Sequence, residues 1–468
     1  MVKVQIFVGK SVVLAHKFVV KNVIMVYNVK RGDIMYRNAM KNLLEWKNKK
    51  NKKPLIIRGA RQVGKTWLMK EFGKKEFEKT VYISFDNNQQ MKDLFEKDMK
   101  TDRIISGIEL YSGSKIDSQN TLLIFDEVQE VPKALTALKY FNENASEYQI
   151  ICAGSLLGVA LHQGTSFPVG KVEFMDLYPL SFTEFMNAMG KPQFIKLLEE
   201  GNYDLATTFK QEYIDLLKYY YYVGGMPEAV SYFSKNMDFN EVRKIQENIL
   251  MAYEQDFSKH APNEVIPRIR MLWNSIPSQL TKENKKFIYG LIKEGARAKE
   301  YEMSMLWLID CGLVHKIQRV TVPSLPLKAY EDLKAFKLFV LDVGLLSCMV
   351  RLNQSVLLNG NDLFKEFKGA LTEQYVLQQL KTYDYMDTYY WTNDRGNAEI
   401  DFLVDTGGKI IPIEVKAEEN LKAKSLKIYH DKFKPSISVR TSMSDFKKED
   451  WLLNLPLWAM ESMGNEVK

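Results

Sequence analysis

The chain has 468 residues and a formal net charge of +7, from 65 Lys and Arg against 58 Asp and Glu. This length exceeds one ordinary hydrophobic core and predicts roughly two to four domains. The composition is that of a soluble globular protein, and the modest positive charge permits a nucleic-acid partner without requiring one. Cys152, Cys311 and Cys348 are far apart in apolar surroundings, which argues against a disulfide framework or a zinc site and favours a cytoplasmic location.

The N-terminal residues 1–34 are apolar and basic. Lys10, Lys17 and Lys21 interrupt the apolar run, so no stretch of about 18 apolar residues is present and we expect no membrane partner. Residues 30–34 can be encoded by a purine-rich stretch that resembles a bacterial ribosome-binding site just upstream of Met35. We therefore expect residues 1–34 to be an upstream extension or disordered.

A phosphate-binding loop is the clearest motif of the chain. It reads G-A-R-Q-V-G-K-T and stands between the apolar run at 55–57 and the helical pattern W-L-M-K-E-F. Gly59 and Gly64 allow the backbone N–H groups to approach the phosphates of a nucleotide, and the helix that follows directs its positive end at the same anion. Lys65 is expected to reach the β- and γ-phosphates, and Thr66 to hold Mg²⁺. The predicted ATP-binding residues of the loop are Gly59, Ala60, Arg61, Gln62, Val63, Gly64, Lys65 and Thr66.

Helix and strand patterns alternate after this loop, which predicts a parallel sheet with helices on both faces. The apolar strand at 122–125 ends in Asp126 and Glu127, at the edge where open α/β sheets bind ligands. Asp126 is expected in the Mg²⁺ shell, and Glu127 is expected to orient or activate the attacking water. The next strand, Y-Q-I-I-C-A-G-S, ends at Ser155, which is either a γ-phosphate sensor, as in AAA+ proteins, or part of a turn.

The middle of the chain is rich in helical patterns and aromatic residues. The run Y-I-D-L-L-K-Y-Y-Y-Y-V at 213–223 is either hydrophobic core, which we favour, or a platform for stacking bases. Residues 297–320 predict a helix, a turn at Gly312 and a strand, the order of a winged helix. Arg297 and Lys299 are then candidate phosphate contacts, although winged helices also serve as protein-packing modules.

A second group of charged residues lies near the C-terminus. Glu373 falls in the predicted amphipathic helix G-A-L-T-E-Q-Y-V-L-Q-Q-L, Asp401 at the turn into a strand, and Glu414 and Lys416 two apart on the next strand, on the same face. Asp401 and Glu414 can share a Mg²⁺ that activates water, while Lys416 lowers the pKa of that water or stabilises the transition state. The alternative is an ordinary edge strand with a charged face.

Five segments together resemble the prokaryotic AAA-family ATPases that carry an uncharacterised C-terminal domain: G-A-R-Q-V-G-K-T, L-L-I-F-D-E-V-Q-E, C-A-G-S-L-L, L-Y-P-L-S-F-T-E-F and Y-V-G-G-M-P-E. The resemblance extends from Met35 to about Met460 and implies an ATPase core, a winged-helix region and a nuclease-like module. Many relatives have Gly-Arg where this chain has Gly170-Lys171, and a lysine lacks the planar fork of an arginine finger.

The D-x12-E-x-K spacing of Asp401, Glu414 and Lys416 resembles the PD-(D/E)xK nucleases, with Glu373 at the position of the helix acid. That fold is also used for binding after metal competence is lost. The resemblance therefore implies catalytic roles for these four residues, or a module that binds without cutting.

The sequence as a whole predicts an α/β chain with a P-loop NTPase sheet. Two functions remain open: a Mg²⁺-dependent ATPase coupled to a DNA-binding or nuclease-like module, and a nucleotide-controlled switch or scaffold with a catalytically inactive C-terminal binding module. A homo-oligomer is compatible with both. The expected divisions are 1–34 (extension), 35–200 (AAA-type ATPase core), 201–285 (helical lid or linker), 286–350 (winged-helix-like region) and 351–468 (nuclease-like domain).

Overall fold

The computed structural model describes residues 16–20, 23–27, 35–154, 168–282, 286–359, 365–383, 385–393, 398–419 and 423–467, with the backbone alone at 16–20, 23–27, 357–359 and 365–367. Strands β1 (His16–Val20) and β2 (Val23–Tyr27) form an antiparallel pair. The remainder of residues 1–34 and the predicted sensor Ser155 lie outside the described residues.

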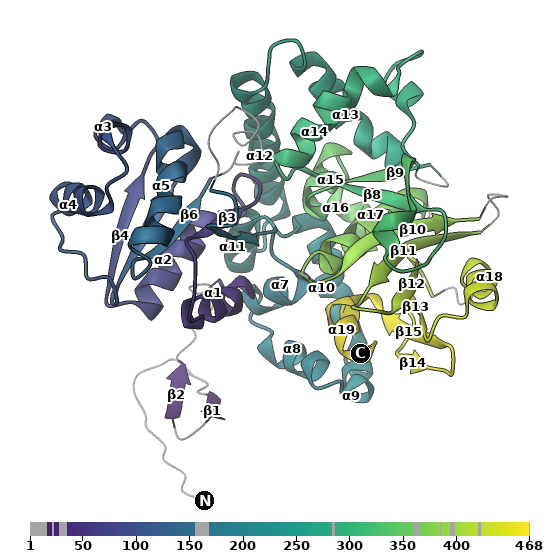
Figure 1. Cartoon of the computed structure of the whole chain (residues 1–468). Coiled ribbons are helices and arrows are strands. Elements are labelled where there is room, and N and C mark those ends of the chain that lie inside the picture. Colours follow the sequence, from purple (N-terminus) through teal and green to yellow (C-terminus); the bar gives the residue numbers. More distant parts are fainter. Residues whose placement is uncertain are drawn as a thin grey trace, which may run out of the picture.

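The N-terminal sheet has five strands in the order β4-β5-β6-β3-β7, and every neighbouring pair is parallel. This confirms the parallel sheet that the alternating pattern predicts. In Figure 1 this sheet lies on the left and the C-terminal sheet on the right, with helices between them. The strands are β3 (Leu55–Arg58), β4 (Lys79–Ser84), β5 (Thr121–Asp126), β6 (Gln149–Ala153) and β7 (Glu173–Asp176).

Helices cover both faces of this sheet because apolar residues fill both sides of its strands. Leu55 and Ile57 share a core with Leu68 of α2, whereas Ile56 shares a separate core with Phe95 of α3. Successive strand residues point to opposite faces, so this division follows directly from the unbroken apolar run. The first face carries α1 (Ala39–Asn48) and α2 (Lys65–Glu76), and the second carries α3 (Gln89–Lys97), α4 (Thr101–Ser112) and α5 (Pro132–Asn144).

A helical region follows, and most tyrosines of its aromatic run at 213–223 are core. Tyr213, Tyr220, Tyr221 and Tyr222 of α10 are buried, which confirms the core interpretation over the stacking platform. All three cysteines are free and buried, as expected. The helices are α7 (Phe182–Ala188), α8 (Pro192–Glu199), α9 (Tyr203–Thr208), α10 (Lys210–Val223), α11 (Pro227–Asn236), α12 (Phe239–His260), α13 (Ile266–Leu280) and α14 (Ala298–Asp310).

The C-terminal sheet is mixed, with eight strands in the order β14-β15-β13-β12-β11-β10-β8-β9. Its strands are β8 (Val314–Val320), β9 (Glu331–Val340), β10 (Asp387–Thr392), β11 (Glu399–Asp405), β12 (Ile410–Val415), β13 (Ser438–Ser442), β14 (Lys447–Lys448) and β15 (Leu452–Pro456). The helices of this part are α15 (Val343–Met349), α16 (Gln354–Asn359), α17 (Lys365–Leu380), α18 (Lys424–Phe433) and α19 (Met463–Glu466).

Several expectations about this region differ from the structure. β8 pairs with β10, so the strand after α14 joins the large sheet instead of belonging to a separate winged helix. The same sheet continues across the expected boundary at 350/351. β12 is flanked by β11 and β13, which excludes the edge-strand alternative. Asp401 lies inside β11, not at the turn before it. Residues 370–380 of α17 are buried on every side, so this helix is not amphipathic.

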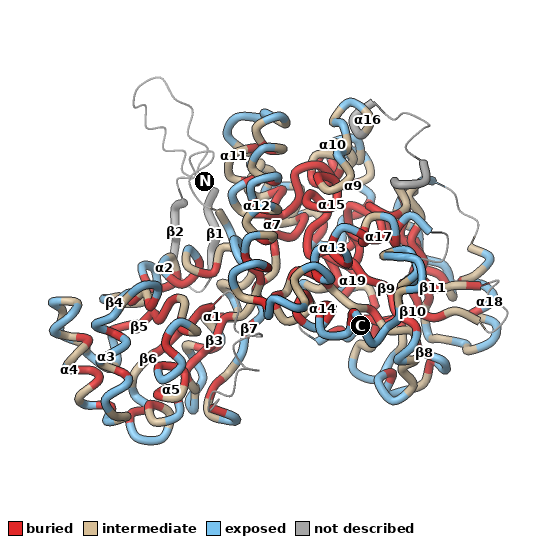
Figure 2. Tube along the Cα trace, turned by 90° about the horizontal axis from the view of Figure 1, so that it is seen from above, coloured by how far each residue is buried: buried red, intermediate tan, exposed pale blue. Residues whose placement is uncertain are grey.

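Residues 370–380 of α17 can all be buried because their polar side chains are paired. Gln374 exchanges two hydrogen bonds with the backbone of Val340, at 3.0 and 2.6 Å. Gln379 accepts from the N–H of Phe182 in α7 at 2.8 Å. The helix therefore connects the C-terminal sheet to the segment that follows the N-terminal sheet, and Figure 2 shows it among the most buried parts of the chain.

Within the residues that the structure describes, no helix is both long enough and apolar enough to cross a bilayer.

Candidate nucleotide site and C-terminal acid cluster

The phosphate-binding loop connects β3 to α2, and its backbone is wound through left-handed conformations. Gly59, Gln62 and Gly64 have φ of +146°, +67° and +94°. A Cβ on Gly59 would lie 2.3 Å from the carbonyl oxygen of Leu177, so only glycine fits there. Left-handed residues within a turn direct N–H groups to one concave side, which is the usual geometry of an anion-binding nest.

Lys65 is the first residue of α2, and its side chain lies back across the loop. Its Nζ donates to the carbonyl oxygens of Gly59 at 2.9 Å and Ala60 at 2.8 Å. Burial lowers the pKa of Lys65 to about 8, although the carboxylates of Glu127 and Asp126 oppose this shift. A buried cation at the positive end of a helix is a favourable neighbour for phosphate oxygens.

Thr66 and Asp126 contact each other although 60 residues separate them in the chain. The Thr66 hydroxyl donates to Oδ2 of Asp126 at 2.6 Å, and the Tyr82 hydroxyl donates to the same oxygen at 3.0 Å. Burial and the Asp126 charge raise the pKa of Tyr82 to about 12, so it remains a donor at neutral pH. A hydroxyl and a carboxylate are the oxygen ligands that Mg²⁺ prefers, and the residues present therefore fit this ion.

Glu127 follows β5 in a left-handed conformation, with φ of +52°. Such a backbone costs about 1–3 kcal/mol for a residue other than glycine and is concentrated at functional sites. The Gln129 amide donates to Oε2 of Glu127 at 2.6 Å and so helps to fix the carboxylate. The arrangement suits a group that orients water.

Arg37 connects the phosphate-binding loop to the segment that precedes α7. Its buried guanidinium donates to the carbonyl oxygens of Val63 at 3.0 Å and Tyr178 at 2.6 Å, and it forms an ion pair with Glu184 at 3.4 Å. Glu184 also completes a capping box with Ser181 at the start of α7. The segment L-Y-P-L-S-F-T-E-F is thereby attached to the phosphate-binding loop.

The helical region lies directly on the same loop. Asp256 of α12 forms an ion pair with Arg61, and the Tyr253 hydroxyl donates to the Arg61 carbonyl oxygen at 2.9 Å. The turn after α14 also reaches the loop, because a Cβ on Gly312 would lie 3.2 Å from the Ala60 nitrogen. The predicted nucleotide site is therefore bounded by residues from the second half of the chain.

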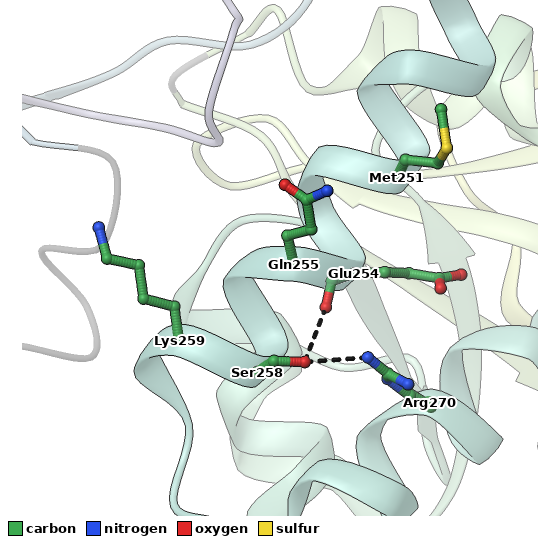
Figure 3. Close-up of a pocket in the computed structure, with 6 residues that line it drawn as sticks. All are labelled: Met251, Glu254, Gln255, Ser258, Lys259 and Arg270. Atoms are coloured by element: carbon green, nitrogen blue, oxygen red, sulfur yellow. Dashed lines mark hydrogen bonds between the residues drawn. The ribbon is translucent and has the colours of Figure 1, made fainter.

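The opposite face of α12 carries a shallow, open pocket of about 420 Å³, which α13 also lines. Figure 3 shows Arg270 donating to the Ser258 hydroxyl, a bond of 2.9 Å, while Lys259 and Gln255 extend from α12. None of the residues that the sequence predicts as functional lies in this pocket.

Lys171, at the position where relatives have arginine, forms an ion pair with Glu143 of α5 at 2.9 Å.

The C-terminal acids gather round a lysine that the sequence did not single out. The Lys337 ammonium, fully buried in β9, lies 2.5 Å from Glu399, 3.6 Å from Glu373 and 4.0 Å from Asp401. Burial alone would lower the pKa of Lys337, but these three carboxylates raise it well above its ordinary value. The structure thus places Glu373 and Asp401 on the same ammonium, that of Lys337.

Glu414 and Lys416 form the second part of this group. Lys416 pairs with Oε1 of Glu414 at 2.9 Å, and Oδ2 of Asp401 accepts from the Val415 N–H at 2.8 Å. Burial raises the pKa of the Glu414 carboxyl, and Lys416 opposes the shift. In the pairing of β11 with β12, Phe402 lies opposite Ile413, and Asp401 and Glu414 are the next residue along each strand. The role of Asp401 and Glu414 as metal ligands stays a prediction. Among the residues that the structure describes, no group of three His, Cys, Asp or Glu side chains is arranged to hold a metal ion.

Sequence reasoning missed Arg37, Tyr82, Asp256, Lys337 and Glu399. For two of them a signal was present. Glu399 stands two residues before Asp401 and therefore shares its strand face, and Lys337 interrupts the apolar run A-F-K-L-F-V-L, as a paired buried lysine does. The others have no local signal, because their partners lie far away in the chain.

Three family models match the chain: an AAA domain at 51–186, a domain of unknown function (DUF8612) at 214–356 and another (DUF4143) at 368–460. No curated protein matches it.

Several solved structures are similar to the chain at low identity. A Walker-type ATPase of Pyrococcus abyssi has 15% identity and a TM-score of 0.45, covering 69% of this chain and 97% of its own. The Aeropyrum pernix Orc1 protein in complex with DNA has 10% identity and a TM-score of 0.28, covering 68% and 93%. The Thermotoga maritima RuvB Holliday junction branch migration motor has 11% identity and a TM-score of 0.27, covering 60% and 89%.

The match to the AAA domain covers the parallel sheet and the loop that carries Lys65 and Thr66. Residues 51–186 therefore match an AAA domain, and they have the parallel sheet and phosphate-binding loop of a P-loop NTPase fold.

Proposed function

We propose that this chain is a Mg²⁺-dependent ATPase. The observation that carries the proposal is the contact of Thr66 with Asp126 at 2.6 Å, beside Lys65 and at the end of strand β5. Bound Mg²⁺ neutralises charge that develops on the phosphates. Thr66 and Asp126 would hold this ion, Lys65 would bind the β- and γ-phosphates, and Glu127 would orient the attacking water.

The test separates binding from hydrolysis. Lys65→Ala is expected to lose nucleotide binding, whereas Glu127→Gln keeps binding and loses about 10²–10⁴-fold in turnover, the usual effect of removing a general base. Lys74→Ala serves as the matched control because Lys74 is exposed on the same helix. A fluorescent ATP analogue measures binding and phosphate release measures turnover. Turnover that is unchanged in Lys65→Ala or Glu127→Gln would remove the assignment.

We further propose that the C-terminal module is what the ATPase controls, and that it is directed to nucleic acid. Two observations support this. Glu373 and Asp401 both lie within 4.0 Å of the Lys337 ammonium, and Asp401 accepts from the N–H of Val415, next to Glu414. Helix α12 contacts the phosphate-binding loop through Asp256 and the residues after α15 through Arg243, which donates to the Leu352 carbonyl oxygen at 3.1 Å. Lys416, one-third exposed beside Glu414, is the candidate contact for a phosphodiester.

Nucleic-acid binding by the full chain tests this second proposal. Labelled DNA and RNA oligonucleotides are expected to bind with an affinity that falls as salt rises and that changes between ATP and ADP. Lys416→Ala should weaken the binding, whereas Lys424→Ala, in the nearby helix α18, should leave it unchanged. Absence of any binding to DNA or RNA in low salt, with either nucleotide, would overturn the proposal.

A further inference from the structure

Lys337 has no exposed surface, which is rare for a lysine and requires a specific set of partners. Its neighbours in β9, Phe336 and Leu338, are also buried, but they point to the other face of the sheet. The Lys337 ammonium instead lies among Glu373, Glu399 and Asp401, and 5.0 Å from the centre of the Tyr390 ring. The cluster therefore contains its own cation, supplied by a strand outside the predicted motif.

This ammonium lies beside Asp401, one of the two residues that the sequence predicts to hold a divalent metal, and beside the helix acid Glu373. Oδ1 of Asp401 is 4.0 Å and Oε2 of Glu373 is 3.6 Å from Nζ, and a divalent ion held between them would need oxygens at about 2.0–2.6 Å. The other oxygen of Asp401 accepts from a backbone N–H, and Glu414 is turned toward Lys416. As arranged, these residues do not fit a metal ion.

We propose that Lys337 is the resident cation of the C-terminal acid cluster, and that it takes the place of the divalent metal a PD-(D/E)xK nuclease would use. The module then recognises its partner without metal-dependent cleavage. This inference rests on the proposed nuclease-like module. Of the two roles that the sequence leaves open for the C-terminal residues, it selects the module that binds without cutting.

Metal binding to the full chain, freed of nucleotide and treated with a chelator, tests the inference. Mn²⁺ uptake followed by electron paramagnetic resonance should be the same in the wild type and in Asp401→Asn, because the cluster takes up no ion. Lys337→Met, which keeps an unbranched side chain one atom shorter and removes the charge, should gain one Mn²⁺ per chain. The double variant Lys337→Met/Asp401→Asn should lose it again.

Two results would overturn the inference: a Mn²⁺ site in the wild type that Asp401→Asn removes, or a folded Lys337→Met protein that takes up no additional ion. If Lys337→Met fails to fold, the comparison of the wild type with Asp401→Asn still decides the question alone. Mg²⁺-dependent cleavage of DNA or RNA that is lost in Asp401→Asn would equally refute it.

The result of the Mn²⁺ experiment can be distinguished from failure of the two proposed functions. Failure to bind any nucleic acid would remove the proposed partner but leave the metal result at Lys337 standing. ATP hydrolysis depends on residues of the N-terminal sheet and should therefore be unchanged in Asp401→Asn. An unchanged rate would confirm that this variant is folded.

Discussion

Lys65 links nucleotide binding to pH, because burial lowers its pKa to about 8. Phosphate oxygens next to its amino group favour the charged form, so the pKa rises in the complex and binding takes up a proton. The charged form predominates below pH 8, so affinity for ATP should be constant there. Above that pH it should fall by about tenfold per pH unit until the pKa of the complex is reached.

Calorimetry in buffers of different ionisation enthalpy measures this uptake. We expect close to one proton taken up per ATP at pH 9, and none at pH 6.5. Lys65→Arg keeps its charge over this range and should bind without proton uptake. Affinity that does not change between pH 7 and 9.5 in the wild type would contradict the linkage.

At the residue scale, the sequence identifies side chains whose role depends on local spacing. Lys65, Thr66, Asp126 and Glu127 are recognisable because a loop and a strand end place them regardless of the rest of the chain. Arg37 and Tyr82 are not, since the contacts that define them join residues more than 20 positions apart. Lys337 is an intermediate case: its burial could be suspected, but its three acidic partners could not be named.

At the scale of elements, α12 is held to the phosphate-binding loop by an unequal ion pair. The Asp256 side chain is 8% exposed and the Arg61 side chain is 48% exposed. Removing Arg61 leaves a buried carboxylate without this partner, whereas removing the charge of Asp256 leaves a guanidinium that water can solvate. Arg61→Ala should therefore reduce the free energy of unfolding by about 1–3 kcal/mol, and Asp256→Asn by less.

Urea unfolding of the nucleotide-free protein measures both free energies. Gln255→Ala, an exposed change on the same helix, should have almost no effect. An equal or greater loss in Asp256→Asn than in Arg61→Ala would show that the asymmetry of burial does not govern this contact.

A second element-scale prediction concerns the turn between α10 and α11. Gly224 has φ of +72°, and a Cβ there would lie 2.1 Å from Oδ1 of the buried Asp342. Gly113 has a similar φ of +64° but open space around it. Gly113→Ala should thus cost only the left-handed conformation, about 1–2 kcal/mol. Gly224→Ala adds a clash worth about 1–3 kcal/mol more, and equal melting temperatures for the two variants would refute this.

Helices and strands that the local sequence determines were predicted well. Those whose surroundings depend on residues far away in the chain were not. The unbroken apolar run at 55–57 reads as a buried parallel strand, and β3 is one. The segment containing Glu373 reads as an amphipathic helix, but α17 is surrounded by protein because its glutamines bond to Val340 and Phe182. The helix, turn and strand at 297–320 read as a separate winged helix, because nothing local indicates that β8 will pair with β10.

At the scale of the whole molecule, the two sheets share one hydrophobic core. Phe182 of α7, Tyr220 of α10 and Tyr375 of α17 form a triangle of rings with centroids 5.6–6.0 Å apart. Glu461, near the C-terminus, accepts hydrogen bonds from the N–H and the hydroxyl of Thr183 at 2.7 and 2.6 Å. A cut at the predicted boundary 200/201 would expose this core, although the motifs of residues 35–200 read as an independent domain.

This shared core predicts that nucleotide binding stabilises the far sheet as well as the near one. A ligand that binds only the folded state adds about 2.7 kcal/mol at a hundred times its Kd, and in one cooperative unit every slowly exchanging amide gains that amount. Hydrogen exchange in saturating ATP analogue should therefore slow in β12 and α17 as much as in β5. Lys65→Ala should show no slowing anywhere, and slowing confined to α2 and β5 would mean that the two sheets unfold separately.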